Sequence, residues 1–279
     1  MLEVPSRLRW VSSYHFMNSN LNVYVLTYCT RVENLYGTTL IFKTLRTGFP
    51  SAFCHVVDNN SLVEVRPTIR AAAVECDVHF TQLNDNKLDH HEFIWSTLAT
   101  QAEGAAVFVD ADLILWENVE NWTFGDALLA GRRIPTYLCP FSQCVIHERL
   151  HSSFLWVPDV AELIAKVRAL RGRHFAFEPF QEFMFNLNKR WQTIDTGGGI
   201  YNALTPSQIH AFNERELNAF DHLLYGSYFK AVVSALEPSY ADKFTEVHKL
   251  AQTDYTQIKG AWRMQSDFFK SLAVSDCNS

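Results

Sequence analysis

The first 120 residues alternate between short apolar runs and segments with helical spacing, and this alternation restricts the fold more than any other feature. Apolar runs typical of strands span Asn22–Thr27, Phe53–Val57, Val78–Leu83 and Ala105–Val109. Helices are predicted between them, at about 32–48, 62–76 and 90–101. Strands that alternate with helices of this length indicate a parallel sheet with right-handed crossovers. In such a sheet we expect ligands beyond the carboxyl ends of the strands.

The second half has a more mixed pattern. Ser153–Val157 is predicted as a strand, and a helix follows with Asp159 as its N-cap and Glu162 completing a capping box. A further helix is predicted from Glu178-Pro179, because proline is favoured in a first turn. Trp191–Asp195 is predicted as a strand that ends at three glycines, and the last third is predicted to be largely helical.

These patterns together predict an α/β protein with a Rossmann-type, mainly parallel sheet flanked by helices and a helical C-terminal part. We expect one domain over residues 1–279, with residues 20–120 as one half and 121–279 as the other. Hydrophobic residues make up 48% of the chain and charged residues 19%, which supports a large core and argues against disorder.

The net charge and the cysteine content bear on nucleic-acid binding and on cellular location. The net charge of −6 gives no global sign of nucleic-acid binding. The six cysteines form no C-x-x-C pair, so a reducing, cytoplasmic location is expected. The first residues carry no long apolar stretch, and no run of 18 apolar residues occurs, so neither a signal peptide nor a transmembrane segment is expected.

The motif Asp110-Ala111-Asp112 follows directly after the apolar strand Ala105–Val109. Two carboxylates one residue apart can reach a single divalent cation if the backbone turns there. Mg²⁺ and Mn²⁺ prefer such oxygen ligands and keep positions open for phosphate oxygens. Because a D-x-D is common and also caps turns, its position at the end of the fourth strand is what favours a metal site.

With this motif in place, the chain resembles a GT-A-type glycosyltransferase that uses a nucleotide-sugar. The segments that carry the resemblance are NVYVLTYCTR, CHVVDNNS, VFVDADLIL and HSSFLWVPDVAEL. It implies a GT-A-like fold, Mn²⁺ or Mg²⁺ as cofactor, and a nucleotide-sugar donor, with a UDP-sugar expected.

The resemblance also implies roles for individual residues. Those implied to face the donor are Thr27, Tyr28, Arg31, Asp58, Asp110 and Ala111. Asp110 and Asp112 are implied at the metal, and His222, in Phe220-Asp221-His222-Leu223-Leu224-Tyr225-Gly226, as the further ligand. Two of these positions also have simpler interpretations: Asp58 as a turn residue, and His222 as a polar group on an amphipathic helix.

A catalytic base is expected beyond the D-x-D motif, among Glu178, Glu182 and Asp195. The phenylalanines around Glu182 favour it, because apolar surroundings raise a carboxylate's pKa and suit it to general-base catalysis. Glu178 as a helix cap and Glu182 as a solvated side chain are the alternatives. The strand from His151 lacks the Asn and Gly that the family often carries near its acceptor.

Two other functions remain open at this stage. One is a phosphatase or phosphotransferase of the haloacid dehalogenase type, with Asp110 as nucleophile and Asp112 as general acid. The other is a non-catalytic sugar-nucleotide-binding module.

The acceptor is the least determined part: a glycan, a protein, a small molecule or a hydroxymethylated base in DNA would fit. Basic clusters that could follow a DNA backbone lie at Gly131-Arg132-Arg133, at 168–174 and at Lys189-Arg190, although solvated loop and helix ends explain each of them too.

Overall fold

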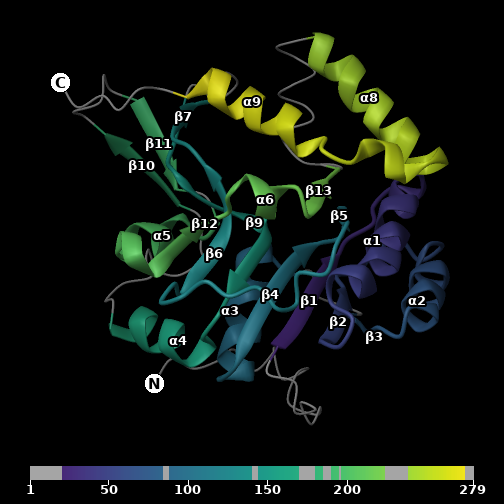
Figure 1. The fold of residues 1–279 in the computed structure, drawn as a ribbon, viewed down its shortest axis with the longest axis horizontal. Helices are drawn as coiled ribbons and strands as arrows, with labels where there is room; N and C mark the ends of the chain where they lie inside the picture. The colour runs from purple at the N-terminus through teal and green to yellow at the C-terminus, as the bar shows by residue number, and fades with distance from the viewer. Residues whose placement is uncertain are drawn as a thin grey trace.

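The computed structural model describes residues 21–83, 88–139, 144–169, 180–184, 190–194, 196–223 and 238–273. A seven-stranded sheet lies at its centre, in the order β12-β6-β9-β4-β1-β2-β3 (Figure 1). Its strands are β1 (Leu21–Thr27), β2 (Phe53–Asp58), β3 (His79–Gln82), β4 (Ala105–Asp110), β6 (Leu129–Ile134), β9 (Arg149–Val157) and β12 (Ile209–Ala211). The neighbouring pairs are parallel except those that β9 makes with β4 and β6.

Helices cover both faces of this sheet. One face packs against α1 (Leu35–Gly48) and α2 (Arg66–Glu75), where Ile41 and Ile69 are fully buried against strand residues such as Val25. The other face packs against α3 (His90–Gln101), α4 (Val160–Ala169) and α5 (Gly198–Ala203). The α/β class, the mainly parallel sheet and the flanking helices predicted from the sequence are therefore confirmed.

The C-terminal part is largely helical, as predicted. It contains α8 (Pro238–Thr253), the 3₁₀ helix η5 (Tyr255–Ile258) and α9 (Trp262–Leu272). Figure 1 shows α8 and α9 lying beyond the end of the sheet where β5 and β13 are found. No helix in the described part of the chain has the length and apolar character needed to cross a membrane.

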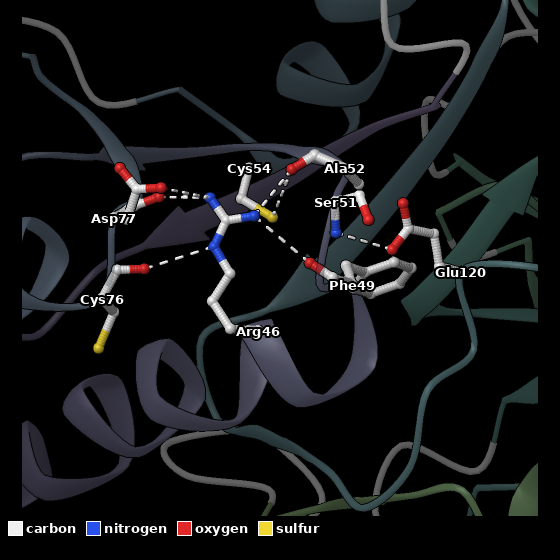
Figure 2. Close-up of polar contacts among 8 residues, drawn as sticks. All are labelled: Arg46, Phe49, Ser51, Ala52, Cys54, Cys76, Asp77 and Glu120. Atoms are coloured by element: carbon white, nitrogen blue, oxygen red, sulfur yellow. Dashed lines mark hydrogen bonds and ion pairs between the residues drawn. The ribbon is translucent and has the colours of Figure 1, made fainter.

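Arg46 joins the C-terminal ends of α1 and α2, close to where β2 and β3 begin. Its guanidinium donates hydrogen bonds to the carbonyl oxygens of Ala52 at 2.9 Å, Phe49 and Cys76 at 3.4 Å, and also to that of Asp77 (Figure 2). These acceptors follow α1 and α2, where helix carbonyls lack partners. Arg46 thus fixes both helices against the strands that follow them.

Several further small strands are present, and only one of them was predicted, the strand expected over Trp191–Asp195, which is β11. A four-stranded sheet runs β10-β11-β8-β7, and β13 pairs with β5. Their bounds are β5 (Leu113–Leu115), β7 (Tyr137–Leu138), β8 (Val145–Ile146), β10 (Phe180–Met184), β11 (Arg190–Ile194) and β13 (Phe220–His222).

The helix predicted from Glu178-Pro179 is wrong over the described residues. Residues 180–184 form β10, which pairs antiparallel with β11, so that Glu182 lies opposite Gln192. Pairing with a strand further along the chain outweighed the local preference of proline for a first turn. Two other predictions hold with small shifts: α2 begins at Arg66 rather than Leu62, and Asp159 accepts the Glu162 N–H at 2.8 Å as the capping box requires.

Candidate active site

Asp110 and Asp112 lie where β4 ends, at the carboxyl edge of the parallel strands. At this edge Asp110 is level with Leu26 of β1, and Thr27 of β1 is level with Asp58 of β2. The chain turns after Asp110 and enters β5 at Leu113. Both carboxylates therefore lie at this turn, with only Ala111 between them. The parallel sheet therefore places the D-x-D motif where ligands of such sheets bind.

His222 completes a three-residue cluster with these carboxylates. Its Nε2 lies 2.8 Å from Asp112 Oδ1 and 3.6 Å from Asp110 Oδ2. One ligand atom from each of the three residues falls within 4.8 Å of the others. The side chains of Asp110, Asp112 and His222 are 27%, 15% and 5% exposed, so the cluster is partly open on the aspartate side.

The pairing of β13 with β5 brings His222 to the D-x-D motif. His222 is level with Leu113, and the Leu223 N–H donates to the Asp112 carbonyl at 2.9 Å. His222 therefore lies in a strand, and the alternative of an amphipathic helix is wrong. Successive side chains in a strand face opposite sides, so the neighbouring Asp221 points away from the cluster.

Asp221 fixes this strand to the C-terminal helices. It is fully buried, and its Oδ2 accepts from Trp116 Nε1 and Gly260 N at 2.7 Å, while its Oδ1 accepts from Trp262 N at 2.6 Å. Burial raises the pKa of Asp221 to about 6, although the three hydrogen bonds act in the opposite direction. His222 is thus held between the D-x-D turn and the segment that begins α9.

The electrostatics of the cluster favour a bound cation. Burial raises the pKa of Asp110, and the nearby Asp112 charge adds to this, against the lowering effect of His90 and His222. Burial alone would lower the pKa of His222, but the carboxylates Asp112 and Asp110 outweigh it and the pKa is raised. Two acids and an imidazole that share a partly buried space fit a divalent cation with oxygen and nitrogen ligands.

Two histidines that the sequence reasoning missed lie beside this cluster. His90, the first residue of α3, has its Nε2 3.7 Å from Asp110 Oδ1. His151, near the start of β9, has its ring centroid 5.6 Å from that of His222. The segment His151-Ser152-Ser153 precedes a predicted strand in the sequence, but nothing local indicates that this strand lies beside β4 and enters the sheet from the D-x-D edge.

His151 has an unusual environment for a histidine. Its pKa lies well below the ordinary value, first because the ring is desolvated and then because His222, Arg149 and Arg132 are positively charged neighbours. Arg132 and Arg149 are themselves buried, at 5% and 6% exposure. The ring is therefore neutral near pH 7.

The residues implied for the nucleotide fall into two groups. Tyr28 and Arg31 are exposed just beyond β1, with Tyr28 at 44%, whereas Thr27 and Asp58 have no exposed surface. Thr27 Oγ1 donates to Asp58 Oδ1 at 3.3 Å, the Ser61 N–H donates to the same oxygen at 3.3 Å, and Arg66 Nε lies 3.7 Å from Asp58 Oδ2. Asp58 thus closes the turn after β2, as its simpler interpretation had it, and its contact with a nucleoside stays a prediction.

The candidate catalytic carboxylates cannot be placed as fully. Glu178 and Asp195 lie outside the described residues, and Glu182 is described only through the backbone of β10. Their catalytic role stays a prediction. Of the basic clusters, Arg132 is buried in β6, and Arg133 donates to Glu148 through its Nε at 2.8 Å. This pair therefore does not form an open basic surface, and positions 170–174 and Lys189 lie outside the described residues.

Comparisons with known proteins identify no close relative. No protein-family model and no curated protein sequence matches the chain. Solved structures do match. They include the apo structure of the bifunctional glycosyltransferase WbbM, with a TM-score of 0.46 and 12% identity, where the match covers 71% of this chain and 40% of WbbM.

Two further matches have similar scores. The mannosyltransferase PcManGT from Pyrobaculum calidifontis, solved with GDP-Man and Mn²⁺, has a TM-score of 0.42 and 13% identity over 95% of this chain and 88% of its own. A nucleoside-diphosphate-sugar pyrophosphorylase from Vibrio cholerae has a TM-score of 0.39 and 10% identity over 70% and 93%. Two of the three matched proteins are glycosyltransferases, and all three matches have TM-scores below 0.5.

Proposed function

We propose that this protein is a metal-dependent glycosyltransferase that moves a sugar from a nucleotide-sugar, with a UDP-sugar expected, to a hydroxyl acceptor. The observation that carries the proposal is the cluster of Asp110, Asp112 and His222 at the carboxyl end of β4. The half formed by residues 20–120 would bind the donor, and the half formed by 121–279 would supply the third metal ligand and the acceptor side.

Asp110, Asp112 and His222 would hold Mn²⁺ or Mg²⁺. When bound, such a cation neutralises the charge that develops on a departing diphosphate. The protein's own contribution is the arrangement: β4 and β5 fix the two carboxylates, and β13 fixes the imidazole from the other side. Tyr28 and Arg31, which are exposed beyond β1, would contact the nucleoside over β1 and β2.

If the sugar is transferred with inversion, a carboxylate must take the proton of the acceptor hydroxyl. It must lie across the sugar from the diphosphate, which excludes the two aspartates at the metal. Glu182 is our candidate, with Asp195 and Glu178 as alternatives. Its position in β10 sets it on a strand of the smaller sheet rather than on a helix.

The proposal is tested by incubating the protein with Mn²⁺ and a panel of UDP-, GDP-, ADP- and CMP-sugars. Glycan, protein, small-molecule and hydroxymethylated DNA acceptors are included, and products are read by mass spectrometry. We expect transfer with one acceptor class, or slow donor hydrolysis without acceptor, and loss of both in EDTA. Trapping of an aspartyl-phosphate on Asp110 would instead support the haloacid-dehalogenase-type function, and absence of any turnover with intact donor binding would support a binding module.

A further inference from the structure

We propose that His151 is a sugar-binding residue, held as the Nε2–H tautomer so that it donates a hydrogen bond to a hydroxyl of the transferred sugar. This inference rests on the proposed function. It concerns the sugar part of the donor, for which the proposed metal ligands and the residues Tyr28 and Arg31 have no assigned role.

His151 lies in an irregular part of β9, beside the end of β4. Val109 of β4 pairs with Phe154 of β9, so the residues just before Phe154 lie level with Asp110. Between the pairs that Gly131 and Arg133 make with β9, strand β6 contributes one residue and β9 contributes four, His151 to Phe154. Such bulges bend a strand and re-aim its side chains, often beside active sites. Here the bulge lies directly beside the D-x-D motif.

The order of the strands along this edge places β9 next to β4, on the side away from β1. Neighbouring strands run β2, β1, β4 and β9, with spacings of about 5 Å. A nucleotide-sugar carries its parts in a fixed covalent order, with the diphosphate between the nucleoside and the sugar. With the diphosphate at the metal ligands of β4 and the nucleoside over β1 and β2, the sugar falls on the remaining side, over β9. His151 is the residue of that bulge in ring contact with His222.

Hydrogen bonds at Nδ1 determine which nitrogen of the His151 ring carries the proton. The Ser153 N–H donates to His151 Nδ1 at 3.1 Å, and the Ser153 hydroxyl lies 2.6 Å from the same nitrogen. A nitrogen that accepts a backbone N–H carries no proton of its own. Because Nδ1 accepts this N–H, the ring carries its proton on Nε2, for which the described part of the chain shows no hydrogen-bond acceptor.

An N–H donor at Nε2 restricts the chemical group that His151 can bind. A neutral N–H suits an uncharged acceptor, and a sugar hydroxyl oxygen is one. A phosphate oxygen would be bound better by a cation, and a divalent cation held by Asp110, Asp112 and His222 would supply that charge one strand away. His151 is thus expected to contact the sugar rather than the nucleotide.

The test compares affinities for the nucleotide with and without its sugar. Titration calorimetry with Mn²⁺ measures UDP against UDP-glucose, and GDP against GDP-mannose, for the wild type, His151→Phe and His151→Gln. His151→Phe keeps a ring without a donor, while His151→Gln restores an N–H donor at about the position of Nε2. His91→Phe serves as the matched control, because His91 is a partly exposed histidine on α3.

We expect His151→Phe to weaken binding of the nucleotide-sugar about 5- to 10-fold, the loss of one hydrogen bond, and to leave the free nucleotide unchanged. His151→Gln should recover part of the loss, and His91→Phe should behave as wild type. An equal loss for nucleotide and nucleotide-sugar, or no loss for either, overturns the assignment while the proposed function stands. A wild type that binds no nucleotide with Mn²⁺ overturns both.

The tautomer is tested separately by ¹⁵N NMR of histidine-labelled protein, which needs no ligand. A proton on Nε2 of His151 and a bare Nδ1 are expected. A protonated Nδ1 would overturn the proposal whatever the binding data show, and the same spectrum establishes whether His151→Phe and His151→Gln keep the fold.

Discussion

Replacing Asp221 should weaken both the fold and the metal centre, although Asp221 contacts no ligand. Asp221→Ala leaves three N–H donors without their acceptor: that of Trp262, which is buried, and those of Trp116 and Gly260, which are partly buried. At about 1–2 kcal/mol each, the three lost hydrogen bonds cost about 3–6 kcal/mol. The substitution also removes a buried charge, which offsets part of this cost, because burial raises the pKa of Asp221 to about 6 even with the three hydrogen bonds in place. The net loss of unfolding free energy is therefore expected near the lower end of this range, at about 3 kcal/mol.

The effect on the metal follows from the strand that Asp221 shares with His222. With its outer side released, β13 holds the imidazole less firmly, and groups that orient a metal ligand typically contribute about 10- to 100-fold to affinity. We expect Mn²⁺ binding to weaken by about 10-fold or more, measured by calorimetry under conditions where circular dichroism shows the variant folded. Asp254→Ala, which removes an exposed cap of η5 in the same segment, is the control and should bind Mn²⁺ normally. Unchanged Mn²⁺ affinity in a folded Asp221→Ala protein would refute the reasoning.

Three further predictions test separate parts of the account. Arg46→Ala should lower the free energy of unfolding by about 2–4 kcal/mol in urea titrations, because four carbonyl oxygens lose their donor, and an equal stability would show that the α1–α2 contact is dispensable. Burial lowers the pKa of His55 to about 3, below its unfolded value of 6.5, so lowering the pH below 6.5 protonates His55 in the unfolded state first and reduces the free energy of unfolding. By pH 5 this reduction amounts to about 2 kcal/mol, and denaturation curves of His55→Phe at the two pH values should not show it. Glu182→Gln should lower kcat by about 10²- to 10⁴-fold with donor affinity intact if transfer inverts the anomeric configuration, and normal turnover or a retained configuration would remove Glu182 as the base.

The sequence predicted those parts of the site whose signals are local. Four apolar runs and their intervening helices gave β1 to β4, and the D-x-D motif follows the last of them without interruption. The strand that carries His222 could not be found in this way. β13 is three residues long and pairs with β5 more than a hundred residues earlier, so neither strand has a periodic pattern of its own. Only the family resemblance indicated His222.

Other residues show the same limit from opposite directions. His90 and His151 were missed because a single histidine at a helix start or in a strand has no chemical signature until the topology places it beside Asp110. Asp58 shows the reverse case. Its position at the end of β2 was predicted correctly, but strand order does not show that its carboxylate is buried and accepts hydrogen bonds from Thr27 of β1 and from the Ser61 N–H in the turn that follows.

The most direct test of the central claim is a Mn²⁺ titration followed by electron paramagnetic resonance, with and without UDP or GDP. For the wild type we predict one Mn²⁺ site whose affinity rises when the nucleoside diphosphate is added, because open positions on the cation accept phosphate oxygens. Asp112→Asn should lose this site and keep its fold, whereas Asp126→Asn, an exposed carboxylate in the loop before β6, should titrate as wild type. A Mn²⁺ affinity in Asp112→Asn equal to that of the wild type, or a wild-type affinity that the nucleotide leaves unchanged, would contradict the account.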